Sequence, residues 1–276
     1  GVAIVDGTAP HVVEPKYPGA VERYVNLGEC YDTQALWERR EALMACMTGY
    51  KGCYQRAYRC LGASAEIFED VRSTLLTDVL GEKLAKRAHG ILSREFKKRK
   101  GVQSGQVKQR FLGAVTHKGA MTLFDTATAQ CDRIYELVDS YGLAHELLVH
   151  ILAGGAAGGY DIVACPDPMA PDRLAHLLVP GLGLAFLTST SVLPFPGRPY
   201  RRIRLDAAAD REILRHSRPR LRFAKKVSAA LAEEAVESLA QAKAMHDDLE
   251  ALYHPYVNFE LVDETALAIA AELSLL

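Results

Sequence analysis

The stretch from Arg133 to Leu148 (RIYELVDSYGLAHELL) constrains the fold of this chain more than any other part. Its pattern predicts a short buried strand at 134–138, a loop at 139–142 and a helix from 143 to 155. A strand, a tight loop and a helix in this order build phosphate-binding loops, because the helix N-terminus offers free N–H groups and a partial positive charge to an anion. The stretch therefore predicts the shape of such a loop.

The residues that would make this loop bind a phosphate are missing. A working loop has the pattern Gly-x-x-x-x-Gly-Lys-Ser/Thr, in which the glycines admit the phosphates, the lysine neutralises charge and the hydroxyl holds magnesium. Asp139 and Ala144 stand at the two glycine positions, His145 stands at the lysine and Glu146 at the hydroxyl. We expect the shape to survive without its ligand chemistry. The degenerate nucleotide loop consists of Asp139, Ser140, Tyr141, Gly142, Leu143, Ala144, His145 and Glu146.

Length and composition narrow the protein class. A chain of 276 residues is long enough for one large or two ordinary domains. It is 49% hydrophobic with a formal net charge of −1, which excludes a disordered chain and gives a nucleic-acid partner no electrostatic support. The densest basic run, 97–100, is interpreted as a solvated helix end, and no apolar run is long enough for a membrane span. Six cysteines without a Cys-x-x-Cys pair favour a reducing, cytoplasmic setting.

The chain also contains an internal similarity. Residues 1–8 (GVAIVDGT) resemble residues 183–190 (GLAFLTST), and a Pro/Gly-rich loop follows each of them. Farther on, residues 61–71 match residues 239–249 without a gap. Two copies of one unit explain this pattern if the given sequence begins in the middle of the first copy. The sequence therefore predicts a fragment of a longer tandem protein, with residues 1–107 as the back part of a first unit and residues 108–276 as a complete second unit.

Strands alternate with helices over most of the chain, which predicts an α/β fold with a mainly parallel sheet and helices on both faces. Long helical regions are added to it as an appendage. Expected strands lie at 2–6, 133–138, 160–165, 183–188 and 201–205. Expected helices lie at 33–72, 75–99, 119–130, 143–155, 171–178, 208–216, 219–252 and 263–274.

Four segments carry a family resemblance: VAIVDGTAPHVVEPKYPGAVERYVNLGE (2–29), RAYRCLGASAEIFEDV (56–71), FLGAVTHKGAMTLFDT (111–126) and GYDIVACPDPMAPDRLAHLLVPGLGLAFLT (159–188). They resemble the tandem P-loop ATPase-like proteins of Firmicutes and related bacteria. The resemblance implies a P-loop NTPase-like fold with ATP and magnesium as ligands of the intact protein. It also implies a first P-loop upstream of Gly1. In the second unit the family's glycine-rich run falls on Asp139 to Glu146, where Gly142 alone is kept.

The segment DGTAPH follows the first expected strand. Ligands of open α/β sheets bind at the carboxyl ends of strands, so Asp6 can hold a magnesium-bound water for the first loop, with Thr8 and His11 in the pocket. The alternative is an Asx turn in a proline-shaped loop. Thr188 is the uncharged counterpart of Asp6 in the second unit. Lys118 has two interpretations: it contacts an anion on the nucleotide side of the sheet, or it is an ordinary surface lysine.

Two further patterns have a functional and a structural interpretation. His145 and His150 suggest a zinc peptidase helix, with Glu233 or Glu234 as third ligand, but five-residue spacing turns the two rings apart by roughly 140°. A decayed phosphate loop is the preferred interpretation. Cysteines at every seventh position indicate a buried helix seam, because such positions are about 10 Å apart, too far for one metal. They are Cys46, Cys53 and Cys60.

These patterns together predict a P-loop ATPase-family fragment whose second nucleotide site is degenerate, so that this half is structural or regulatory. The resemblance suggests an ATPase, whereas this chain lacks an intact loop and is expected to be inactive alone. A small-molecule binding module without hydrolysis is the alternative, and a zinc hydrolase is a third. The expected partner is a nucleotide in the parent protein, without nucleic acid or membrane. Self-association through the edge of strand 2–6 is a further expectation.

Overall fold

The computed structural model describes residues 2–8, 12–97, 99, 101 and 103–273. The chain forms two compact units. The terminal unit comprises residues 1–50 and 244–276, and the sheet unit comprises residues 51–243. These units are defined by contacts, so the sequence repeat and its boundary at residue 107 stay predictions.

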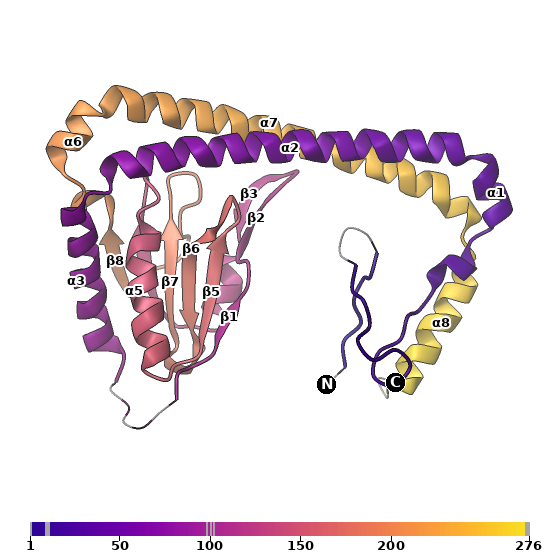
Figure 1. Cartoon of the computed structure of the whole chain (residues 1–276), viewed down its shortest axis with the longest axis horizontal. Coiled ribbons are helices and arrows are strands. Elements are labelled where there is room, and N and C mark those ends of the chain that lie inside the picture. The colour runs from indigo at the N-terminus through magenta and orange to yellow at the C-terminus, as the bar shows by residue number, and fades with distance from the viewer. Residues whose placement is uncertain (1, 9–11, 98, 100, 102, 274–276) are drawn as a thin grey trace. The chain divides into compact units, whose positions relative to one another are not determined.

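A six-stranded sheet forms the centre of the sheet unit (Figure 1). Its strand order is β1-β5-β6-β7-β4-β8. The strands are β1 (Val107–Gln109), β4 (Arg133–Val138), β5 (Ile162–Asp167), β6 (Ala170–Val179), β7 (Leu184–Ser189) and β8 (Arg201–Arg204). Strand β6 is antiparallel to both neighbours and all other pairs are parallel. The predicted α/β class with a mainly parallel sheet is confirmed, and its assignment to the P-loop fold stays a prediction.

The two faces of the sheet are covered differently, as the alternation of side chains along β4 shows. Tyr135 and Leu137 belong to a core with helices α3 (Asp78–Glu95) and α5 (Ala144–Ala157). Ile134 points the other way, into a core with the short helix α4 (Phe124–Thr128). A hairpin of β2 (Gly113–Thr116) and β3 (Gly119–Thr122) precedes α4. Both faces are therefore covered, and β4 is buried on each side.

Within the sheet unit, the two long helices α2 (Arg40–Leu75) and α7 (Arg218–Tyr253) run antiparallel and side by side (Figure 1). Within the sheet unit, six of their buried positions recur at seven-residue intervals, as in a coiled coil. These positions are Ala57, Ser64 and Val71 on α2, and Ser228, Ala235 and Ala242 on α7. Small side chains let the two helices approach closely, and the Ser64 hydroxyl donates to the Ser228 carbonyl at 3.3 Å. A buried seam therefore exists, but the prediction placed it on the wrong residues, because Cys46, Cys53 and Cys60 are only half-buried.

The remaining described helices are shorter. They are η1 (Leu27–Cys30), α1 (Thr33–Glu38), η2 (Pro180–Leu182), η3 (Asp206–Ala208), α6 (Arg211–His216), η4 (His254–Tyr256) and α8 (Phe259–Glu272). No helix in the described part of the chain combines the length and the apolar character that crossing a bilayer requires.

Three predicted elements are wrong. Residues 2–6 form no strand, and Val2, Ile4 and Val5 are exposed, because no described strand pairs with them. The predicted helix 171–178 is strand β6, which lies between β5 and β7, so sheet pairing overrides its helix-like composition. The first part of the predicted helix 119–130 is strand β3, because Gly119 at φ 107° turns the chain back into a hairpin.

The close approach of α2 and α7 makes a prediction about Ala235, which is fully buried. Substitution Ala235→Leu forces four-carbon bulk into a seam of small side chains, which should lower the free energy of unfolding by about 1–3 kcal/mol. Urea titrations followed by far-UV circular dichroism measure the difference. Ala230→Leu is the matched control, because Ala230 is exposed on the same helix. An equal effect of both substitutions would contradict close packing at the seam.

Candidate functional site

The predicted strand, loop and helix around residue 140 are confirmed. Strand β4 ends at Val138 and helix α5 begins at Ala144, so the loop is Asp139 to Leu143. Gly142 adopts φ 73°, a conformation that glycine tolerates and most side chains do not. This requirement explains why a glycine stands at position 142.

The Asp139 side chain turns toward the backbone of the loop that follows it. Its Oδ1 accepts the Tyr141 N–H at 3.0 Å, and its Oδ2 accepts the Ala144 N–H at 2.7 Å. Only 3% of the residue is exposed. An incoming phosphate would need these same N–H groups at the start of α5. The chain's own carboxylate therefore stands where the phosphate would bind.

Opposing effects act on the pKa of Asp139. Burial raises this pKa above its ordinary value and is the largest influence. Hydrogen bonds from the backbone of Leu143, Tyr141 and Ala144 lower it, and the nearby Asp206 carboxylate raises it further. The net shift is upward, so the ionised carboxylate carries a desolvation cost that the backbone hydrogen bonds offset only in part.

A second carboxylate closes the other side of the loop. Asp206 follows strand β8, and its two oxygens accept the Ser140 N–H at 2.8 Å and the Ser140 hydroxyl at 2.7 Å. The backbone N–H groups of residues 140, 141 and 144 thus all donate to carboxylates. These three donors are therefore not available to an added anion.

The residues at the lysine and hydroxyl positions are held against strand β6. The Leu174 N–H donates to His145 Nδ1 at 2.9 Å. Arg173 donates to Glu146 Oε1 and to the Gly142 carbonyl, each at 3.1 Å. Burial lowers the pKa of His145, and the Arg173 charge lowers it further. A neutral imidazole therefore replaces the cation that a phosphate-binding loop needs.

Helix α2 contributes a buried arginine to the same place. Arg72 forms an ion pair with Glu69, and its Nη1 lies 3.7 Å from the point where Gly142 would carry a Cβ. Burial has the largest effect on the pKa of Arg72 and lowers it, and the positive charge of Arg173 lowers it further. Two arginines thus approach the loop, but both are paired with glutamates.

Most of the other predicted pocket residues do not reach this loop. Lys118 lies exposed in the β2–β3 turn, where its N–H donates to the Thr116 hydroxyl. Thr188 on β7 donates its hydroxyl to the Ala175 carbonyl. Asp6 accepts both the N–H and the hydroxyl of Thr8, which is the Asx-turn arrangement. His11 lies outside the described residues, and Asp6 and Thr8 belong to the terminal unit.

The zinc candidates are not brought together. The His145 Nδ1 atom is engaged by the Leu174 N–H, the His150 ring lies beside His89, and Glu234 pairs with Arg56. Within the described residues, the group whose ligand atoms could share one ion is His246, Asp247 and Glu250. It contains none of the predicted zinc ligands.

The other face of the sheet buries a row of polar side chains. Glu136 accepts the Ser189 hydroxyl at 2.8 Å and Arg202 Nε at 2.5 Å. His176 on β6 is buried beside Cys165 on β5, and its Nδ1 accepts the Thr188 N–H at 3.0 Å. Burial lowers the pKa of His176 to about 4 and raises that of Cys165 to about 12. Both groups are neutral, so they form no thiolate–imidazolium pair.

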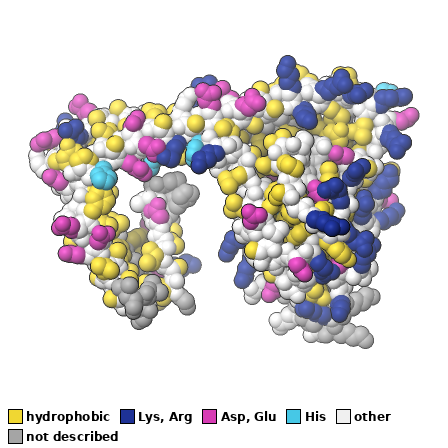
Figure 2. All heavy atoms as spheres, turned by 180° about the vertical axis from the view of Figure 1, so that it is seen from behind, with side chains coloured by type: hydrophobic (Ala, Val, Ile, Leu, Met, Phe, Trp, Pro, Cys, Tyr) yellow, Lys and Arg dark blue, Asp and Glu magenta, His cyan; other side chains and the backbone are white. Residues whose placement is uncertain are grey.

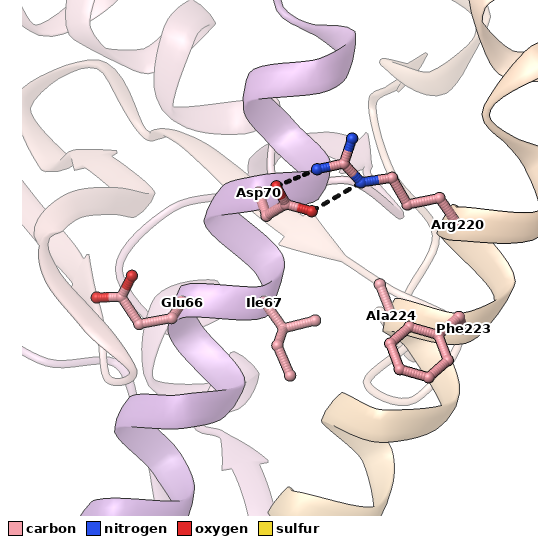
Figure 3. Close-up of a pocket in the computed structure, with 6 residues that line it drawn as sticks. All are labelled: Glu66, Ile67, Asp70, Arg220, Phe223 and Ala224. Carbon is pink, nitrogen blue, oxygen red and sulfur yellow. Dashed lines mark hydrogen bonds and ion pairs between the residues drawn. The ribbon is translucent and has the colours of Figure 1, made fainter.

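A groove of about 370 Å³ lies between α2 and α7 (Figure 3). Ile67, Phe223 and Ala224 line it, together with an ion pair of Asp70 and Arg220. In Figure 3 the Arg220 guanidinium reaches across to the Asp70 carboxylate. The groove is an open surface between two helices that this ion pair connects.

Sequence reasoning identified the loop but missed the side chains that close it. Arg72, Arg173 and Asp206 come from three other elements. A signal existed for Asp206, because a polar residue directly after a predicted strand lies at the edge where ligands bind. Nothing local marked Arg72 or Arg173, since both lie in sequence patterns that suit a solvated helix.

Comparisons with models of protein families, with curated proteins and with solved structures found no match to this chain. The resemblance to tandem P-loop ATPase-like proteins therefore remains a prediction.

Substituting Asp139 tests the closure of the loop. Asp139→Ala leaves the N–H groups of Tyr141 and Ala144 without their acceptor, which should cost about 1–3 kcal/mol of unfolding free energy. Inorganic phosphate should stabilise this variant more than the wild type, because the anion can take the vacated place. Thermal melts with phosphate or chloride at equal ionic strength measure both effects. Asp172→Ala is the control, since Asp172 is exposed nearby. Equal phosphate effects on all three proteins would contradict the closure.

Burial of His176 predicts a pH dependence. Its folded pKa of about 4 lies below the ordinary 6.5, so protonation favours the unfolded chain. Its contribution to stability is present above the unfolded pKa and is lost as the pH falls toward the folded one. Between about pH 7.5 and about pH 5.0 this loss should be about 2 kcal/mol.

The variant His176→Asn should reduce this pH dependence, because its amide oxygen can still accept the Thr188 N–H. Urea titrations at the two pH values measure it, with the exposed His117→Gln as control. An unchanged pH dependence in His176→Asn would show that His176 is not its source.

Proposed function

We propose that this chain is part of a P-loop NTPase-like protein in which the loop at 139–146 no longer binds nucleotide and serves as a structural or regulatory element. The observation that carries the proposal is the Asp139 carboxylate on the N–H groups of Tyr141 and Ala144. The position of β4 between β7 and β8 supports it as well. Ligands of open α/β sheets bind at such a place, where the strand order reverses.

Electrostatics supports the exclusion of nucleotide. A triphosphate would have to displace Asp139 and approach Glu146 and Asp206, while His145 offers no charge to replace a lysine. Thr188 supplies no carboxylate for magnesium at the end of β7. Phosphoryl transfer depends on compensating the charge of the transferred group, and without a lysine and a magnesium ligand the rate should fall by orders of magnitude.

The contacts of the loop also support its structural role. Through Asp206, Arg173 and Arg72 it touches the segment after β8, strand β6 and helix α2. It therefore joins the carboxyl edge of the sheet to the helix pair. In the proposed intact protein, ATP and magnesium bind at the first unit or on another subunit, and this loop fixes the helices that extend from the sheet.

Thermal melts with ATP and magnesium test the proposal. A ligand stabilises the folded state by RT ln(1 + [L]/Kd), so about 5 mM ATP with Kd near about 50 μM would add about 2.7 kcal/mol. We expect less than about 0.4 kcal/mol for the wild type, which corresponds to Kd above about 5 mM. Isothermal titration calorimetry should show no heat of binding.

The control is ATP without magnesium, which separates site binding from magnesium-independent effects of anions. Tight magnesium-dependent binding of ATP that is lost in His145→Ala would place a live nucleotide site at this loop and end the proposal.

A further inference from the structure

Basic residues concentrate in one part of the sheet unit. Residues 198–226 contain 11 of the 33 lysines and arginines and only three acids, Asp206, Asp210 and Glu212. This segment has a formal charge of +8, from 11 minus 3, so the other residues carry −9 to give the total of −1. The basic segment comprises Arg198, Arg201, Arg202, Arg204, Arg211, Arg215, Arg218, Arg220, Arg222, Lys225 and Lys226.

All of these side chains are exposed. They belong to the loop before β8, to β8 itself at the edge of the sheet, to α6, and to the first turns of α7. Figure 2 shows lysine and arginine side chains gathered over this part of the molecule. The charge is therefore presented on a surface.

The helical spacing directs one group of these residues away from α2. Arg218, Arg222, Lys225 and Lys226 recur at intervals of three, four, seven and eight residues, so they share one face of α7. Arg220 is turned from Arg218 by roughly 200°. Arg220 Nε donates to Asp70 on α2 at 2.9 Å, as Figure 3 shows. Since Arg220 faces α2, the other four face away from it.

Little within the chain neutralises this charge. In the described part of the chain, Arg202 pairs with Glu136 and Arg220 with Asp70, while the other nine basic residues form no ion pair. The acids of the segment are engaged elsewhere: Asp206 binds Ser140, and Asp210 caps α6 through the N–H groups of residues 212 and 213. Like charges at such density repel one another, and an external polyanion removes that repulsion.

We propose that β8, α6 and the first turns of α7 form a surface that binds the phosphate backbone of a nucleic acid without reading its sequence. Nine of the eleven basic residues are arginines, whose planar guanidinium groups match phosphate oxygens with two hydrogen bonds. Tyr200 lies half-exposed with the Arg201 guanidinium 5.3 Å from its ring centre, which offers a stacking surface for a base. The formal net charge of −1 averages over this local concentration of positive charge and therefore does not exclude a nucleic-acid partner.

A membrane surface fits this patch less well. Helices that lie in a lipid interface bury a broad apolar face beside their basic residues. Among the described residues of α6 and the first three turns of α7, the exposed large hydrophobic side chain is Phe223 alone. The basic face of α7 from Arg218 to Lys226 is about 12 Å long, which matches three or four phosphates along one strand.

Fluorescence anisotropy with labelled oligonucleotides of roughly 30 residues tests the proposal, using oligo-dT, a single-stranded RNA and a duplex of the same length. Affinity for at least one of them should fall as KCl rises from about 50 to about 200 mM, with a log–log slope of roughly −3 for single strands if four phosphates are contacted. The variant Arg215→Ala/Arg218→Ala/Arg222→Ala should bind on the order of 10- to 100-fold more weakly and reduce that slope by roughly 2.

The matched control is Lys51→Ala/Arg59→Ala/Lys108→Ala, which removes the same charge from exposed positions outside the segment. Its affinity should stay within about threefold of the wild type, since distant exposed charges are screened by salt. Circular dichroism confirms that each variant is folded. If the first triple variant does not fold, the single substitutions Arg215→Gln and Arg222→Gln are each expected to weaken binding and reduce the slope by roughly 0.7.

Three outcomes would overturn the proposal. The first is no binding of any oligonucleotide at about 50 mM KCl and protein concentrations up to about 100 μM, since non-specific complexes fall within that range. The second is an equal loss of affinity in both triple variants, which would show that binding depends on the net charge of the protein and not on this surface. The third is tighter binding to phosphatidylserine vesicles or polyglutamate than to every oligonucleotide, which would assign the patch to another partner.

Discussion

The rest of the sheet unit depends on how the free N–H groups at the start of α5 are satisfied. A buried helix N-terminus needs acceptors, and they come either from a bound ligand or from the chain. Here Asp139, directly after β4, accepts the N–H of Ala144, the first residue of that helix, and the N–H of Tyr141 in the loop. A tethered acceptor loses no translational freedom on binding, so its effective concentration is far above that of free nucleotide. The loop is thereby stable without a ligand, although the raised pKa of Asp139 shows that burial of the carboxylate is costly.

Once the loop is fixed, it positions the elements around it. Ser140 joins it to Asp206 after β8, and the Gly142 carbonyl joins it to Arg173 on β6. Val71 and Leu75, on either side of Arg72, form a small core with Ala224 of α7 and with Tyr141 of the loop. The C-terminal end of α2 and the first turns of α7 thus pack against the loop. A loop that exchanged ligands would have to break and remake these contacts, and burial makes each such exchange expensive.

The sequence predicted those features that local patterns determine. Strand β4, the loop and helix α5 follow from an apolar run, a turn and a helical run, and all were found at the expected residues. Strand β6 was not predicted, because its pairing with β5 and β7 outweighs the helix-like composition of residues 171–178. The strand predicted at residues 2–6 is wrong, because no described strand lies beside it to supply hydrogen bonds. Arg72 and Arg173 reach the loop through the tertiary fold, which no spacing in the sequence encodes. The basic segment escaped notice because its residues are spaced through strand and helix rather than contiguous.

Two arrangements of charge lie close together in this unit, and burial distinguishes them. At the loop, carboxylates occupy enclosed N–H groups, where an added phosphate would meet like charge in a medium of low dielectric. On β8, α6 and α7, exposed arginines face water, where a phosphate backbone can bind without displacing any internal partner. Asp206 lies within the basic segment, and its carboxylate accepts the N–H and the hydroxyl of Ser140 in the loop. The same residue therefore connects the closed loop to the basic segment on the adjoining surface.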